Sequence, residues 1–123
     1  MTRMNLEAMP VDELVSRFAE IGVAQDDALL GDEFAKFNRL FEQMQAISQE
    51  LKRRPGDQRR ALLGLYEHPN MQVRVKAAKH TLAVAPQAAR QALEAIKASQ
   101  WQPQALEAGM SLWNLDEGVF KPT

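Results

Sequence analysis

The two histidines, His68 and His80, are the side chains best suited to hold a metal ion in this chain, which has no cysteine. They lie twelve residues apart, whereas a metal-binding pair on one helix needs a spacing of about three or four. His68 precedes a proline in an expected turn, and we expect His80 on the exposed side of a helix. The sequence therefore predicts no metal site, and the lack of cysteine excludes disulfides and thiolate nucleophiles.

Carboxylates occur as adjacent pairs that are poorly placed for acid–base catalysis. The pairs are Asp26–Asp27, Asp32–Glu33 and Asp116–Glu117. Adjacent residues do not face each other on a helix, so they cannot share a proton or a substrate atom. No serine lies in a G-x-S-x-G motif, and the segment RRPGDQRR has one glycine and indicates a helix end followed by a helix start. We nominate no catalytic residue and no cofactor, and we expect the protein not to be an enzyme.

Charge is segregated along the chain, although 15 basic and 16 acidic residues give a net charge of only −1. Four basic against ten acidic residues give −6 over residues 1–50, nine against two give +7 over 51–90, and two against four give −2 over 91–123. Spacings of three and four stack side chains on one helix face, which groups Lys76, Lys79 and His80. The candidate partner-binding residues of this basic stretch are Arg53, Arg54, Arg59, Arg60, Arg74, Lys76, Lys79 and His80.

Three interpretations of the basic stretch are open. Its side chains form a solvated face that pairs with the acidic first half of the chain, or they bind an acidic protein partner, or they bind nucleic acid or phosphate. Nucleic acid is disfavoured because the chain is not basic overall and contains no recognition motif. The question that separates these interpretations is whether the cationic side chains point outward and remain unpaired.

The elements that position these residues are all expected to be helices. Strong helix formers dominate the composition, and no segment alternates in the manner of a strand. Gly31, Pro55–Gly56 and the turn before Asn70 separate the periodic segments, and Asp57 and Asn70 are suitable N-caps. We expect helices over residues 10–30, 32–53, 58–67, 70–84, 86–98 and 103–115, followed by an irregular tail over 116–123.

The expected second helix carries a single apolar stripe. Its members are Phe34, Phe37, Phe41, Met44, Ile47 and Leu51. Burying each such side chain contributes about 1.5–3 kcal/mol, so a small domain is expected to use the stripe as core. A homodimer seam is the alternative, because so long an amphipathic helix can exceed what four short helices cover. We also expect Val119 and Phe120 to pin the tail to the core.

The second half of the chain contains a weak internal repeat. A shift of 31 residues superimposes Leu62 on Leu93, Leu65 on Ile96, Ala77 on Ala108, Ala78 on Gly109 and Val84 on Leu115. The segment HPNMQVRVKAAKHTLAV resembles a HEAT-type repeat, with Pro69, Asn70, Val73, Arg74, Ala77, Ala78 and Leu82 at the positions of the motif. Asn70 stands where that family often has Asp, which weakens any inferred ladder of Asp–Arg contacts.

A second resemblance covers nearly the whole chain. The segments DDALL, FAKFNRLF, ELKRRPGDQRRALL, HPNMQVRVKAAKHTLAVAP and GMSLWNLDEGVFKP resemble a bacterial family catalogued as domain of unknown function 2019. The resemblance implies a small, all-helical, HEAT-like protein, and it brings no activity, cofactor or catalytic residue.

Together these observations predict an all-α fold of about six helices in antiparallel pairs that form a short right-handed HEAT-like solenoid. We expect a single domain over 1–123, with a helical hairpin over 10–53, HEAT-like helices over 57–115 and a tail over 116–123. No apolar run approaches the ~18 residues that a membrane span needs, and the N-terminus lacks a signal-like apolar region, so we expect a cytoplasmic protein. The expected function is a non-catalytic interaction module, such as an inhibitor or immunity-like protein, that binds an acidic protein partner. The alternative is a HEAT-like protein that binds nucleic acid or processes DNA bases.

Overall fold

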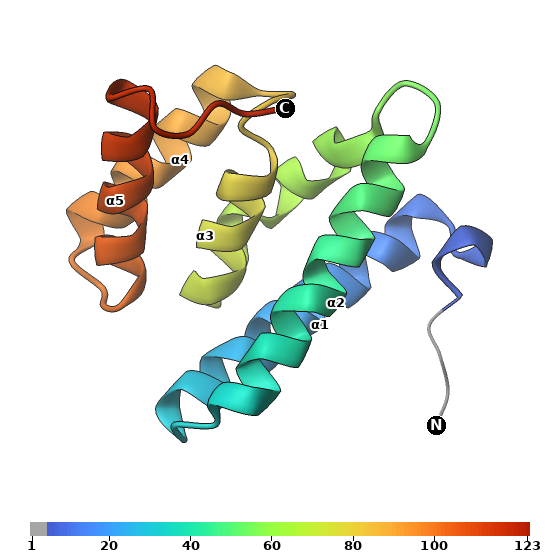
Figure 1. The fold of residues 1–123 in the computed structure, drawn as a ribbon, viewed down its shortest axis with the longest axis horizontal. Coiled ribbons are helices and arrows are strands. Elements are labelled where there is room, and N and C mark those ends of the chain that lie inside the picture. The colour runs from blue at the N-terminus through green and yellow to red at the C-terminus, as the bar shows by residue number, and fades with distance from the viewer. Residues whose placement is uncertain (1–4) are drawn as a thin grey trace. The chain divides into compact units, whose positions relative to one another are not determined.

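The structure is a computed structural model that describes residues 5–123, and these residues form helices and connecting turns (Figure 1). The elements are the 3₁₀-helix η1 (Leu6–Ala8), α1 (Val11–Leu30), α2 (Phe34–Arg53), the 3₁₀-helix η2 (Gln58–Glu67), α3 (Met71–His80), α4 (Pro86–Ser99) and α5 (Gln104–Asp116). No residue from 5 to 123 lies in a strand. The prediction of an all-α protein with about six helices is confirmed, and the solenoid arrangement of those helices stays a prediction.

Local signals place the helix boundaries. Helix α2 ends at Arg53, and Pro55 and Gly56 follow it in the turn. Gly56 has a left-handed backbone, with φ of 79°, which directs the chain away from the helix axis. The side chain of Asn70 accepts hydrogen bonds from two backbone N–H groups in the first turn of α3, as expected of an N-cap. Pro86 is the first residue of α4, where its missing N–H costs no hydrogen bond.

The chain divides into two compact units, the first ending at Ala61 and the second beginning at Leu62. In the first unit α1 and α2 pack as an antiparallel hairpin (Figure 1). The large buried side chains on these two helices are Leu14, Phe18, Ile21, Met44, Ile47 and Leu51. The C-terminal half of the predicted stripe on α2 is therefore core.

The N-terminal half of that stripe contradicts the prediction. Phe34 is 65% exposed and Phe41 is 42% exposed, while Phe37 is half-buried. They lie on the same helix face as Met44 and Ile47, so periodicity alone does not distinguish covered from uncovered turns. Leu30, at the end of α1, is also exposed, at 82%.

The second unit packs α3, α4 and α5 around one apolar cluster. Its buried members are Val75, Ala78, Leu82, Ala89, Leu93, Ile96, Ala108 and Leu112. The expected helix over 70–84 is too long, because α3 ends at His80. At the end of the helix the backbone N–H of Thr81 bonds to the carbonyl oxygen of Ala78, three residues earlier, and the Thr81 hydroxyl donates to the carbonyl oxygens of Ala77 and Ala78. Val119 is 67% exposed and does not pin the tail to the core, whereas Phe120 is 48% exposed and lines a small cavity together with the core residue Leu82.

Candidate functional site

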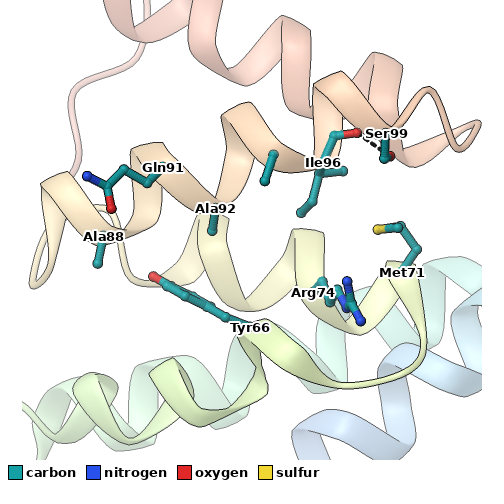
Figure 2. A pocket seen from close by; sticks show the side chains of 9 residues that line it. Tyr66, Met71, Arg74, Ala88, Gln91, Ala92, Ile96 and Ser99 are labelled. Atoms are coloured by element: carbon teal, nitrogen blue, oxygen red, sulfur yellow. Dashed lines mark hydrogen bonds between the residues drawn. The ribbon is translucent and has the colours of Figure 1, made fainter.

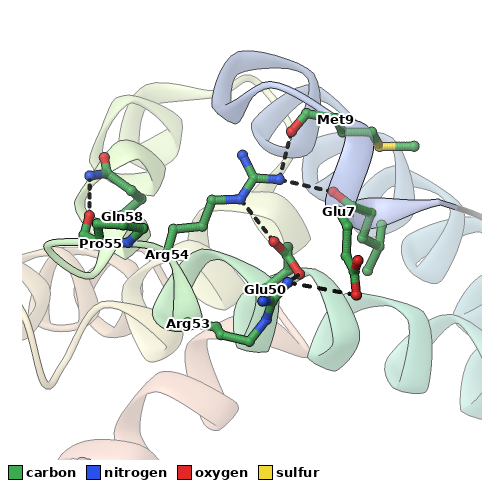
Figure 3. Close-up of polar contacts among 8 residues, drawn as sticks. Glu7, Met9, Glu50, Arg53, Arg54, Pro55 and Gln58 are labelled. Carbon is green, nitrogen blue, oxygen red and sulfur yellow. Dashed lines mark hydrogen bonds and ion pairs between the residues drawn. The ribbon is translucent and has the colours of Figure 1, made fainter.

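The basic stretch begins at the end of α2, where two arginines share one carboxylate (Figure 3). Arg54 Nε lies 2.8 Å from Glu50 Oε2, and Arg53 donates to Glu50 Oε1. The hydrogen bonds from Arg54 and then Arg53 hold the pKa of Glu50 below its ordinary value. Glu7 approaches Arg53 at 4.0 Å. One buried carboxylate therefore serves two guanidinium groups, and Glu7 gives Arg53 a second, more distant carboxylate.

Arg54 and Arg53 differ in what else they contact. Arg54 Nη2 donates to the backbone oxygens of Leu6, at 2.9 Å, and Met9, at 2.6 Å, which attaches η1 to the end of α2 (Figure 3). Its side chain is only 20% exposed. The Arg53 side chain is 62% exposed. The guanidinium of Arg54 is therefore bonded to groups of the first unit and mostly buried, whereas part of the Arg53 guanidinium is exposed to solvent.

The next two arginines differ in ion pairing and exposure. Arg59 forms a two-pronged ion pair with Asp57, with Nε 2.9 Å from Oδ1 and Nη2 2.7 Å from Oδ2. These hydrogen bonds lower the pKa of Asp57. The Asp57 side chain also accepts from the backbone N–H of Arg59, so the predicted capping role of Asp57 is confirmed at the start of η2. Arg60 is exposed and makes no ion pair within the described residues.

In the second unit two lysines of α3 share the carboxylate of Glu107 on α5. Lys76 Nζ and Lys79 Nζ lie 2.7 Å and 3.0 Å from the same oxygen, Glu107 Oε2. Burial would raise the pKa of Glu107, but the charges of Lys76 and Lys79 and their hydrogen bonds outweigh it, and the pKa is lowered. The Lys76 side chain is only 9% exposed and that of Lys79 37%.

Arg74 and His80 complete the predicted set. Arg74 Nε donates to the backbone oxygen of His68, and no ion pair joins Arg74 to a carboxylate among residues 5–123. His80 is half-buried at the end of α3. Lys76, Lys79 and His80 lie on α3 as expected, and five of the candidate basic side chains are paired with carboxylates of their own unit, as the first of the three interpretations partly allows. The paired residues are Arg53, Arg54, Arg59, Lys76 and Lys79.

A groove of about 340 Å³ crosses the second unit between α4 and the segment formed by η2 and α3 (Figure 2). Its lining is mostly apolar, and Arg74 is the one charged residue in it. Sequence reasoning missed this groove. The available signal was the spacing of Ala88, Ala92 and Ala95, which places three small side chains on one face of α4.

A row of large apolar side chains is exposed on α5. Leu106, Met110 and Trp113 follow one another at spacings of four and three, and each is 58–62% exposed. Trp101, just before the helix, is 63% exposed. Exposed apolar side chains that follow one another in this way are a candidate for an interaction surface.

The described residues contain no group of three or more His, Asp or Glu side chains arranged to hold a metal ion. None of the helices in that part of the chain is both long and apolar enough to cross a membrane.

The helices described above make this a small all-α protein. The chain belongs to the family described as domain of unknown function (DUF2019), whose model matches residues 12–116. It is also similar to the protein RPA1889 from Rhodopseudomonas palustris CGA009, whose crystal structure has a TM-score of 0.95 and 58% sequence identity. That similarity covers 98% of this chain and 100% of the other. Among proteins with curated descriptions, none matches the chain.

Proposed function

We propose that the protein is a non-catalytic interaction module of the cytoplasm that binds an acidic protein partner, as an inhibitor or immunity-like protein would. The observation that supports this proposal is the set of cations that stay accessible in spite of internal pairing. Arg60 is exposed and makes no ion pair within the described residues, the Arg53 side chain is 62% exposed although it shares Glu50 with Arg54, and the Lys79 side chain is 37% exposed although it shares Glu107 with Lys76. A surface with residual positive charge attracts acidic partners and orients their approach.

The contacts narrow the residues that take part. Arg54, Arg59 and Lys76 are buried or nearly so and are bound to groups of their own unit, which gives them a structural role. In the first unit the accessible cations are Arg53 and Arg60, and in the second they are Arg74 and Lys79. Each of these pairs forms the proposed partner surface of its own unit.

The exposed row on α5 favours a protein over a nucleic acid as the partner. Protein interfaces are enriched in Trp, Met and Arg, and their binding energy concentrates in a few large apolar or arginine side chains. Met110 and Trp113 have this character, and both are more than half exposed. Affinity for a phosphate backbone comes mainly from cations and would leave this apolar row without a role.

The test is affinity capture from the native cell with the full chain as bait. The variant Arg53→Glu/Arg60→Glu removes two accessible cations of the first unit. Its matched control is Lys36→Glu/Arg39→Glu, which changes the net charge equally at two exposed residues of α2 outside the basic stretch. We expect one or more acidic proteins to be captured by the native chain and by the control, and to be reduced at least about tenfold with the first variant. Equal capture by all three would overturn the proposal.

Salt dependence separates the nucleic-acid alternative from the proposed one. A protein that contacts duplex phosphates loses affinity with a slope near −0.9 per contact in a plot of log K against log salt concentration. We expect a mixed-sequence DNA duplex and an RNA hairpin to show no retardation by this protein, even at low salt. Retardation that is abolished by Arg53→Glu/Arg60→Glu would support the nucleic-acid function instead.

Self-association is a separate proposal that rests on α2. Phe34 and Phe41 are 65% and 42% exposed on the same face of the helix, which supports the homodimer seam considered for this stripe. Sedimentation equilibrium of the native chain and of Phe34→Ser/Phe41→Ser tests it. A dimer that the double variant dissociates supports the seam, and a monomeric native chain at about 100 μM argues against it.

A further inference from the structure

The groove between α4 and the η2–α3 segment combines an apolar floor with a single cation. Small side chains of α4 form one side, where Ala88, Ala92 and Ala95 leave room above the helix. Tyr66 and Met71 form the other side (Figure 2). The Tyr66 hydroxyl is hydrogen-bonded to the Thr81 hydroxyl, so the ring of Tyr66 is the part available to a ligand.

Arg74 is held in a way that leaves hydrogen-bond donors available. Its Nε is bonded to the backbone oxygen of His68, which fixes the plane of the guanidinium. No ion pair within residues 5–123 engages Arg74, in contrast to Arg54 and Arg59, which are each bound to a carboxylate. A guanidinium held through Nε and lacking a counter-ion at the edge of an apolar groove is suited to one carboxylate, because its terminal N–H groups can bind two oxygens together.

The dimensions limit the ligand to a short segment. The row from Ala88 to Ala95 spans seven residues of helix, or about 10 Å at ~1.5 Å per residue. An extended chain covers this length with about three residues at ~3.3 Å each. The volume of about 340 Å³ lies at the lower end of the range for small-ligand pockets.

We propose that this groove binds the C-terminal end of a partner polypeptide, with apolar side chains along the alanine row and the terminal carboxylate on Arg74. A terminal carboxylate directly follows the last side chain, and one unpaired cation beside an apolar floor matches one negative charge beside apolar groups. The inference deepens the proposed function and rests on it, because it names the segment of an acidic partner that the second unit would recognise.

The probe is the dipeptide N-acetyl-leucyl-leucine, titrated into the ¹⁵N-labelled full chain and followed by NMR. We expect the amide signals of Ala92 and Ala95 and the Arg74 side-chain Nε–H signal to shift together and to saturate at millimolar concentration. The matched probe is the C-terminal amide of the same dipeptide, which lacks only the negative charge. We expect it to bind about tenfold more weakly, because a hydrogen bond to a charged group is lost.

Three variants assign the site. Arg74→Gln should reduce the affinity for the acid about tenfold and leave that for the amide unchanged. Ala95→Leu should abolish binding of both probes, because it fills the floor at an exposed residue without burying new volume in the core. Ala98→Leu is the control, since Ala98 is equally exposed on α4 but does not line the groove. Amide spectra of each free variant check that the second unit keeps its fold.

Several results would overturn the inference. Equal affinity of acid and amide, or unchanged binding by Arg74→Gln, would remove Arg74 from the site. Stronger binding of N-acetyl-leucyl-aspartate α-amide, whose side-chain carboxylate is free, than of the acid would assign the groove to an internal acidic residue instead of a chain end. Failure of the proposed function is distinguishable, because it appears as the absence of a captured protein while the dipeptide still binds the groove.

Discussion

Glu107 holds two lysines, and neutralising it tests how the second unit is stabilised. In Glu107→Gln the side chain keeps its shape but loses its charge, so Lys76, with a side chain only 9% exposed, loses the carboxylate that lies 2.7 Å from its Nζ. Removing one partner of a fully buried ion pair costs about 3–5 kcal/mol, and exposed pairs contribute about 0.2–1 kcal/mol. Glu107 is 27% exposed and Lys79 37%, so solvent screens part of the loss. We expect a destabilisation of about 2–3 kcal/mol.

The measurement is urea unfolding at pH 7 followed by circular dichroism. A loss of about 2–3 kcal/mol changes the unfolding equilibrium about 30- to 150-fold and lowers Tm by about 8–15 °C for a chain of this length. The matched control is Glu94→Gln, because Glu94 is 58% exposed and pairs with Arg90 at 3.6 Å. We expect the control to change stability by less than about 0.5 kcal/mol.

A double variant separates electrostatics from packing. Lys76→Met removes the buried charge that Glu107→Gln leaves behind, so Lys76→Met/Glu107→Gln should recover most of the lost stability. If Glu107→Gln is as stable as Glu94→Gln, the cluster is screened by water and the argument from burial fails. If the double variant is no more stable than Glu107→Gln, the loss has a cause other than the missing carboxylate beside Lys76.

Three further predictions concern pH and local structure. The pKa of Glu107 is lower in the folded than in the unfolded chain, so its contribution to stability is present above the unfolded pKa and is lost as pH falls through the folded pKa. On acidification below about pH 5 the native chain should therefore lose more stability than Glu107→Gln. Parallel profiles of stability against pH for the two proteins would contradict this. Asn70→Ala should cost about 1 kcal/mol by removing the cap of α3, with Asn70→Ser losing less, as measured by urea unfolding. Gly56→Ala should cost about 1–2 kcal/mol because φ there is 79°, whereas Gly64→Ala, at an open position without positive φ, should be nearly neutral; equal Tm values for the two variants would refute the backbone argument.

Helix boundaries were largely predictable because the signals that set them act over a few residues. The expected helix over 58–67 coincides with η2, and the expected start at Pro86 coincides with the start of α4. The helix after Asn70 was predicted too long because its sequence contains no proline or glycine before the turn. The hydrogen bonds of the Thr81 hydroxyl to two helix carbonyls were not visible in the sequence.

The residue types of the candidate site were predictable from the sequence, but the ion pairing of those residues was not. The run of positive charge identified Arg59 and Lys76 as candidates, yet both are engaged by carboxylates of the same unit. The Asp57 partner lies two residues from Arg59, but the Glu107 partner lies 31 residues from Lys76, so only a folded second unit brings them together. The groove beside Arg74 likewise depends on α3 and α4 packing side by side.

By itself, the sequence determined the helical character of this protein, most of its helix limits and the concentration of cations between residues 51 and 90. The tertiary structure decided which half of the α2 stripe is covered, which cations are neutralised and where a groove opens. The physical reason is the separation along the chain over which each kind of interaction acts. Propensity, caps and turn residues act within about one helical turn, whereas burial and ion pairing depend on segments that meet only after the chain has folded.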